Sequence, residues 1–396
     1  MRLIYSLSDT LENFFSYAVD CISFDNLSKI SVLWSILTII WIFLPKKIKY
    51  RINIKYKRLF KKKIIVNDFY KVGDMEFDDV VILDGIVSDY YFSIKSDNKE
   101  AKLPLELRKI SEKFKKENEL RQLNNISPIY TDLEPYAIKS INFCRDNVEG
   151  EKNRCIIHVR KSSYFNSLIS VLALDEKLRN GQTVKDKYYK KIIEDPYTPS
   201  PNGDNLINAL GVNVLVLTGD GKIVLAERNG RNVSTAKGAV HISMGEHLNK
   251  EVIDLNSDGE IDLTVAAKRG LFQELGLTVK ECNELDIRFY CIGFTPKLCQ
   301  YGTFGFTEIE LTSAELEERR KLAKDGKYEI KKLHYIDTSL KSFVNFLINT
   351  DIAITQWAIV SVILFFMQEG FYTLNEINSG FSHKNIDKFR NKIIND

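Results

Sequence analysis

The residues of this 396-residue chain that best suit chemistry lie close together, near position 270. Gly270, Gln273 and Glu274 fall at positions i, i+3 and i+4, so on a helix they share one face. Mg²⁺ in proteins is held by carboxylates together with substrate phosphates, because it loses its water shell reluctantly. This face offers the carboxylate of Glu274 but only an amide from Gln273. Taken alone, these residues are more typical of an exposed helix acid at Glu274 and of an arginine, Arg269, that braces a loop, so the surrounding pattern has to decide.

The surrounding sequence predicts the elements that position these residues. Residues 263–275 read LTVAAKRGLFQEL and are rich in good helix formers, and Gly276 stands where a helix C-cap is expected. Upstream, the runs 212–217 and 222–228 flank an Asp-Gly pair and predict a β-hairpin. A glycine-bearing loop and strand over 237–246 lies between the hairpin and the helix.

This order of elements resembles the Nudix fold, in which a glycine-rich loop leads into a helix with the pattern Arg-Glu-aliphatic-x-Glu-Glu-x-Gly-aliphatic. Five of the seven specified positions agree, over the residues Arg269, Gly270, Leu271, Phe272, Gln273, Glu274, Leu275, Gly276 and Leu277. The likeness covers about residues 205–340. It implies an α+β or α/β fold with a mixed sheet between helices at the C-terminus.

The resemblance also implies roles for particular residues. It makes Arg269, Gln273 and Glu274 the catalytic candidates, and Gly245, Glu246 and Arg269 the nucleotide-binding candidates. In the family three glutamates of the helix hold Mg²⁺, and here the implied metal ligands are Glu274 and, from the loop, Glu246. Because Gly270 and Gln273 stand where the family has two of its three helix glutamates, we expect the site to bind phosphates better than it catalyses hydrolysis.

A narrower resemblance is to the Nudix-containing effectors of bacterial CBASS antiviral systems. It implies an effector that senses a cyclic nucleotide, damages the inner membrane and causes abortive infection. The expected partners are this nucleotide or another nucleotide ligand, membrane lipids and further copies of the chain, whereas a cognate nucleotidyltransferase acts only through its product. Two alternatives are an Mg²⁺-dependent hydrolase of nucleoside diphosphate derivatives, tethered to a membrane, and a tethered scaffold without a ligand.

The N-terminal region carries a second signal. No charged residue lies between Lys29 and Lys46, and the apolar residues there cover the whole circumference of a helix. We therefore predict a tail over 1–28 and a transmembrane helix over 29–46. Ten basic residues within 46–63 follow the helix, which places the N-terminus outside and the body in the cytoplasm of a single-pass inner-membrane protein.

The basic segment 47–63 has more than one interpretation. Next to a span it would bind anionic lipid. Its apolar residues alternate with polar ones, which is typical of a strand or an extended stalk. Nucleic-acid binding is a third interpretation. The rest of the chain is mildly acidic, so we expect no polymeric nucleic acid as a partner.

Residues 64–200 are predicted to form a mixed α/β region of unknown role, with a surface helix over 105–123. Three prolines within PYTPSPNG mark a boundary, after which the Nudix-like domain 204–396 begins. Six scattered cysteines predict neither disulfides nor a zinc site. The apolar run 352–367 is short, so we favour a core helix over a second membrane span.

Overall fold

The chain divides into two compact units, residues 1–53 and 54–396. The computed structural model describes residues 71–84, 91–124, 134–144, 154–199, 206–230, 236–249 and 254–394, all of which belong to the second unit. The predicted tail 1–28, transmembrane helix 29–46 and basic stalk 47–63 lie outside the described residues, as does the predicted boundary after residue 200.

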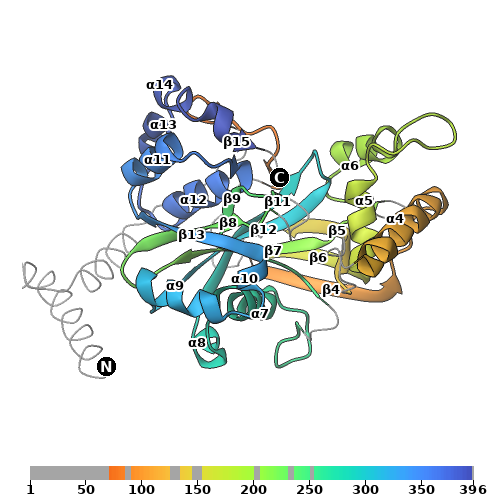
Figure 1. Cartoon of the computed structure of the whole chain (residues 1–396), viewed down its shortest axis with the longest axis horizontal. Coiled ribbons are helices and arrows are strands. Elements are labelled where there is room, and N and C mark those ends of the chain that lie inside the picture. Colours follow the sequence, from red (N-terminus) through yellow and green to blue (C-terminus); the bar gives the residue numbers. More distant parts are fainter. Residues whose placement is uncertain are drawn as a thin grey trace, which may run out of the picture. The chain divides into compact units, whose positions relative to one another are not determined.

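Ten strands within the described residues form one large mixed sheet (Figure 1). Its main path is β15-β14-β9-β8-β7-β12-β11-β3, while β10 pairs with β7 and β13 pairs with β8. The strands are β3 (Val81–Ile82), β7 (Leu210–Leu217), β8 (Lys222–Arg228), β9 (Val240–Ile242), β10 (Met244–His247), β11 (Ile287–Thr295), β12 (Gln300–Glu308), β13 (Ile330–Asp337), β14 (Ile354–Thr355) and β15 (Ile393–Ile394). The predicted hairpin is confirmed as β7 and β8, which are antiparallel neighbours.

Helices pack on both faces of the large sheet. The apolar side chains of β7 at Val212, Val214 and Val216 share a buried cluster with one side of α7 (Leu263–Leu275). Phe304 and Phe306 of β12 lie on the opposite face and pack on α12 (Gln356–Gln368), which they meet through stacked and tilted aromatic pairs. This arrangement confirms the predicted mixed sheet with helices around it.

Besides α7 and α12, this part of the chain contains several shorter helices. They are α8 (Val279–Asn283), α9 (Ser313–Leu322), α10 (Gly326–Glu329), α11 (Leu340–Asn349), α13 (Leu374–Gly380), α14 (His383–Ile386) and a 3₁₀ turn over Arg390–Lys392. Short strands β1 (Lys71–Val72) and β2 (Met75–Glu76) form a separate ladder. Gly73 between them lies against the α13 end, where its amide donates to Asn378 Oδ1 at 2.9 Å.

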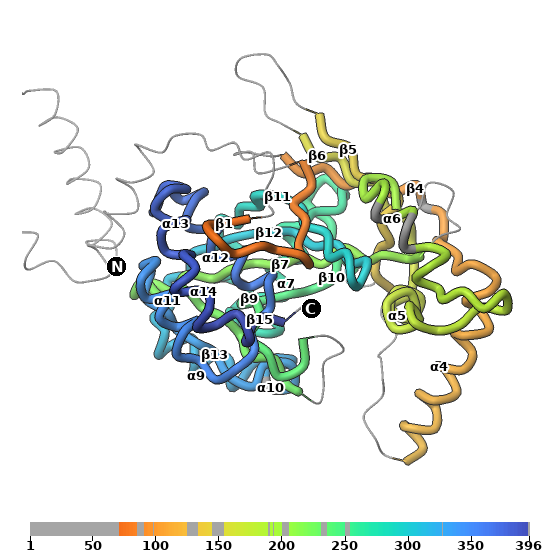
Figure 2. Tube along the Cα trace, turned by 90° about the horizontal axis from the view of Figure 1, so that it is seen from above, coloured from red at the N-terminus to blue at the C-terminus, as the bar shows by residue number. Residues whose placement is uncertain are grey.

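The region before the large sheet forms a small three-stranded sheet. Its strands are β4 (Tyr91–Glu100), β5 (Tyr136–Cys144) and β6 (Arg154–Lys161), in the order β4-β6-β5. The helices are α4 (Leu105–Leu123), as predicted, α5 (Tyr164–Leu172) and α6 (Lys190–Glu194), the last preceded by a π-helical turn over Lys185–Tyr189. Helices α4 and α5 pack side by side (Figure 2). A bridge between Ala137 and Ala209 joins this region to β7.

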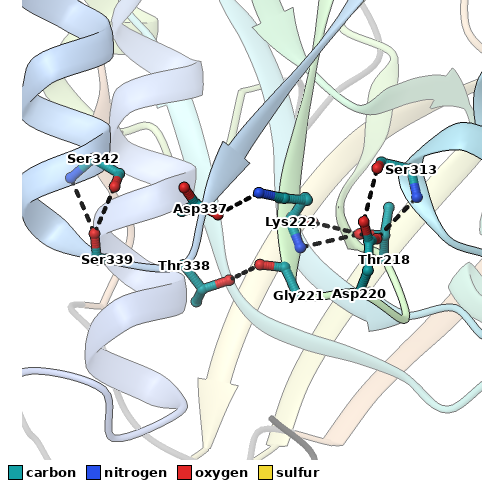
Figure 3. Close-up of polar contacts among 9 residues, drawn as sticks. All are labelled: Thr218, Asp220, Gly221, Lys222, Ser313, Asp337, Thr338, Ser339 and Ser342. Carbon is teal, nitrogen blue, oxygen red and sulfur yellow. Dashed lines mark hydrogen bonds and ion pairs between the residues drawn. The ribbon is translucent and has the colours of Figure 1, made fainter. Parts of the chain in front are cut away.

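The turn of the β7–β8 hairpin is tied to two other elements (Figure 3). The carboxylate of Asp220 accepts hydrogen bonds from Thr218 Oγ1 at 2.6 Å and from both Ser313 N and Ser313 Oγ at 2.8 Å. Thr338 Oγ1 donates to Gly221 O at 2.7 Å. The hairpin turn is therefore tied to the start of α9 and to the segment before α11.

The predicted localisation requires a correction. Among the described residues no helix is both long and apolar enough to cross a membrane, which contradicts the single-pass inner-membrane placement. The apolar run near the C-terminus is a core helix, as favoured above. The helix is α12, which begins at Gln356 directly after the short strand β14 and whose thirteen residues are all buried.

We expect Phe365→Ala to destabilise the protein by about 3–5 kcal/mol, because the ring is fully buried against Phe306 at a centroid distance of 4.8 Å and truncation leaves a cavity. Phe272→Ala is the control, since that ring is 45% exposed and its loss should change stability by about 0.5 kcal/mol or less. Urea unfolding followed by circular dichroism measures both. Equal shifts of the two midpoints would contradict this account of the core.

Candidate functional site

Helix α7 carries the candidate residues and has well-defined ends. Asp262 caps its N-terminus, where its carboxylate accepts a hydrogen bond from Thr264 N at 2.6 Å. Gly276 ends it at a φ of +74°, and a Cβ there would lie 2.4 Å from the carbonyl oxygen of Arg319. Only glycine fits this position. The helix packs on β10 and β7, so the strand with Gly245 and Glu246 runs beside it.

Arg269 is the centre of a buried ion-pair network. Its side chain is 10% exposed, and its Nε and Nη2 donate to the two carboxylate oxygens of Asp254, both at 3.0 Å. Nη2 also donates to His247 O at 2.8 Å, and Nη1 lies 2.7 Å from Glu246 Oε2. The guanidinium is thus occupied by the protein itself, so Arg269 is a positioning residue that fixes β10 and the segment at Asp254.

Gln273 belongs to the same network. Its Oε1 accepts from Arg269 Nη1 at 3.4 Å, and its backbone carbonyl accepts from Asp325 N at 2.9 Å. The side-chain oxygen of Gln273, which we considered as a metal ligand in place of a carboxylate, therefore faces Arg269.

Glu274 lies in the centre of a group of buried carboxyls. It is 6% exposed, and burial, together with the nearby Glu329 and Glu246, raises the pKa of its carboxyl well above the usual value. Burial also raises the pKa values of Glu329 and Glu246, while Arg228 partly opposes this at Glu329 and Arg269 does so at Glu246. Burial therefore disfavours the charged form most strongly at Glu274, whereas Glu246 keeps its ion pair with Arg269.

Two basic side chains border this group. Burial, with Arg228 and Arg269 nearby, lowers the pKa of His247 to about 4, so this ring is neutral at pH 7. The Nε of Arg228 is buried and has no hydrogen-bond partner among the described residues. The described part of the fold therefore leaves this donor unused.

Position 270 on α7 has no room for a side chain longer than that of glycine. A Cβ built on it would lie 2.5 Å from Met244 Sδ and 3.2 Å from Glu246 Cβ. Met244 is fully buried on β10, so its thioether occupies the space that a longer residue at position 270 requires.

The residues present do not fit a resident Mg²⁺. Within the described ranges no group of three His, Cys, Asp or Glu side chains is arranged to hold a metal ion. Of the two expected ligands, Glu246 is paired with Arg269, and Glu274 is in an environment that favours its neutral form.

The structure thus brings together all the predicted site residues, Gly245, Glu246, Arg269, Gln273 and Glu274, on β10 and α7. Sequence reasoning missed three further members of the site, Asp254, Arg228 and Glu329. Asp254 lies in the insertion before the helix, and Arg228 ends a strand, where a basic residue is ordinary. Glu329 comes from α10, far along the chain, and reaches the site because Gly326 packs against the backbone of Glu274.

Comparison with known proteins gives only remote likenesses. No family model and no curated protein matches the chain. Among solved structures, DR0079 from Deinococcus radiodurans is similar, with 16% identity and a TM-score of 0.23 over 35% of this chain and 70% of that one. Another is a bifunctional NMN adenylyltransferase/ADP ribose pyrophosphatase from Francisella tularensis, complexed with AMP and a Mn ion. It is 14% identical with a TM-score of 0.23, and the match covers 40% of each chain.

At these TM-scores neither likeness carries an argument about the fold or the function of this chain. The functional argument therefore rests on the geometry of α7, β10 and their surroundings.

We expect Gly270→Ala to destabilise the protein by about 1–3 kcal/mol because of overpacking against Met244. The same change in a helix without such a neighbour stabilises by about 0.5–1 kcal/mol. In the Met244→Ala background the cost of Gly270→Ala should therefore disappear. Urea unfolding of the two single variants and the double variant gives the coupling energy, and simple additivity would rule out the proposed contact.

A second prediction concerns the pH dependence of stability. Because the pKa of Glu274 is higher in the folded protein than in the unfolded chain, the folded state binds more protons, and the free energy of unfolding falls as the pH rises above about 4.5. Glu274→Gln should flatten this decline and raise stability at pH 7. Part of the slope should remain, since Glu246 and Glu329 shift in the same direction.

The matched control for this prediction is Glu318→Gln, whose side chain is 73% exposed. Thermal unfolding of wild type and both variants between pH 4.5 and 8, in the presence of a chelator, measures the slopes. A Glu274→Gln profile that parallels the wild-type profile would show that this carboxyl is not the source of the decline.

Proposed function

We propose that residues 204–396 act as a nucleotide-binding sensor of Nudix-like type, which holds a cyclic nucleotide without hydrolysing it efficiently. In the antiviral CBASS role that the sequence resemblance implies, a cognate nucleotidyltransferase would make this ligand. Association between copies of the chain would then carry the signal. The localisation of the protein is not part of this proposal.

The observation that carries the proposal is that the residues of α7 at this site are already in contact with other parts of the protein. Arg269 and Gln273 are committed to each other and to the loop, and Met244 occupies the space beside Gly270. Glu274 is the one box carboxylate left, and its environment favours the neutral form. A site built this way suits ligand binding better than activation of a water molecule, which requires a charged base or a metal.

Arg228 supplies the attraction for an anionic ligand. Its guanidinium lies close enough to Glu274 and Glu329 to influence their pKa values, and its Nε has no hydrogen-bond partner among the described residues. Guanidinium groups bind phosphate through charge-assisted hydrogen bonds. Because the pKa values of Glu274 and Glu329 are raised, these carboxyls repel a phosphate less than fully exposed carboxylates would.

The test is calorimetric titration of the full chain with a panel of cyclic dinucleotides and trinucleotides, with and without Mg²⁺, followed by chromatography of the ligand. We expect saturable binding without Mg²⁺ and recovery of intact ligand. Arg228→Gln should weaken binding about tenfold or more, because a hydrogen bond to a charged group contributes about 1.5–3 kcal/mol.

Lys222→Gln is the matched control, since it removes the same charge from the other end of β8 and should leave affinity unchanged. Absence of binding to every ligand would overturn the sensor proposal.

One observation favours a second candidate, the Mg²⁺-dependent hydrolase of nucleoside diphosphate derivatives. Glu329 adds a carboxyl beside Glu274 that the helix pattern does not include. If ligand is consumed only with Mg²⁺ and survives in Glu274→Gln, the hydrolase is the correct function.

A further inference from the structure

A cavity of about 390 Å³ opens between the small and large sheets, away from the site described above. Its walls are the first residues of β4, the segment 256–264 that leads into α7, the start of β11 and the C-terminal end of α12. The cavity touches α7 at Leu263, whereas Glu274 lies eleven residues further along, about 16 Å away at 1.5 Å per residue. Its volume falls in the range of small-molecule sites.

The floor of the cavity is a fixed polar network. The carboxylate of Glu369, whose side chain is 1% exposed, accepts from Arg288 Nη1 and from Tyr290 Oη, both at 2.9 Å. The Arg288 guanidinium also lies over the ring of Phe306, with 5.1 Å between them. These contacts leave Glu369 and Arg288 with little freedom to rearrange, so the floor is preorganised.

Gln368 adds an unused donor to this floor. The residue is 2% exposed and lines the cavity, and its Nε2 has no hydrogen-bond partner among the described residues. A buried amide that makes no hydrogen bond destabilises the folded state unless something outside the chain pairs with it. Because Gln368 lines the cavity, its side-chain amide suits a ligand that carries polar atoms on the edge of a ring.

The side walls are aromatic. The rings of Phe92 and Phe289 meet edge to face, with 6.1 Å between their centroids. Tyr91, at the start of β4, is 53% exposed on the cavity rim. Aromatic faces of this kind stack on flat rings, and they do so with little dependence on the identity of the ring.

The charges around the cavity select against anions. Glu260, Asp262 and Glu369 line it, and Arg288 is the one cationic side chain among the lining residues. A phosphate would be repelled by this excess of acids. An uncharged ring with an N–H or hydroxyl donor is not repelled in this way, and Glu260 offers an acceptor on the cavity wall.

From these observations we infer that the cavity binds an uncharged nitrogen heterocycle of the nucleobase or nucleoside class. The ring packs against the aromatic surface formed by Phe92 and Phe289, and its edge hydrogen-bonds to the side-chain amide of Gln368. This site is separate from the phosphate-type site at Arg228 and Glu274, so each can be tested without the other.

The experiment titrates the full chain with adenosine, guanosine, cytidine and uridine, and with their 5′-monophosphates, by calorimetry. We expect at least one nucleoside to bind saturably and its monophosphate to bind several-fold more weakly. Gln368→Met keeps the length of the side chain but removes the donor, and it should raise the Kd tenfold or more. The melting temperature should stay the same or rise, because an unpaired buried amide is removed.

Two further variants complete the design. Gln122→Met, on the exposed end of α4, is the matched control and should not change the Kd. Tyr91→Ala removes a stacking wall from an exposed position and should weaken binding without loss of folding.

Failure of all four nucleosides to bind would overturn the inference, as would equal affinities of wild type and Gln368→Met. A fall in melting temperature in Gln368→Met without a change in affinity would assign the amide a structural role instead. Binding of cyclic nucleotides, tested through Arg228, should be unaffected by Gln368→Met, so the two proposals fail independently.

Discussion

The ion-pair network around Arg269 is the interaction on which the C-terminal site depends. One guanidinium, 10% exposed, bridges α7 to Glu246 and His247 on β10 and to Asp254 in the insertion. Removing one partner of such a network leaves a buried charge uncompensated, which typically costs about 3–5 kcal/mol. Strand β10 in turn pairs with β7 at the centre of the large sheet, so the network connects the helix to the most buried part of the fold.

The same network involves the two non-acidic residues, Gly270 and Gln273, that share a helix face with Glu274. The side-chain amide oxygen of Gln273 accepts a hydrogen bond from Arg269, so Gln273 is a neutral partner of this guanidinium. The side chain of Met244 on β10 fills the volume next to Gly270 on α7, so a large residue on the strand is matched by a small one on the helix. Burial, together with the nearby Glu329 and Glu246, raises the pKa of Glu274 well above its usual value in this environment.

Local patterns were sufficient to predict much of this fold from the sequence. The Asp-Gly turn predicted β7 and β8, the run of helix formers predicted α7 from Leu263 to Leu275, and the charged stretch 105–123 predicted α4. The apolar run near the C-terminus was correctly assigned to the core as α12. Each of these signals is contained within about twenty residues, where spacing and capping determine the outcome.

What the sequence did not predict comes from contacts between distant segments. Glu329 reaches Glu274 only because α10 packs on the end of α7, where Gly326 leaves no room for a side chain. The cavity beside β4 likewise needs the small sheet, the insertion and the end of α12 to meet, and none of these carries a motif. Because α7 is rigid and its two ends contribute to separate sites, its N-terminal Asp262 and its C-terminal Gly276 fix both sites relative to the same buried helix. A change in the packing of α7 on β7 would therefore alter both sites together, whereas a change in one cavity wall would alter only one.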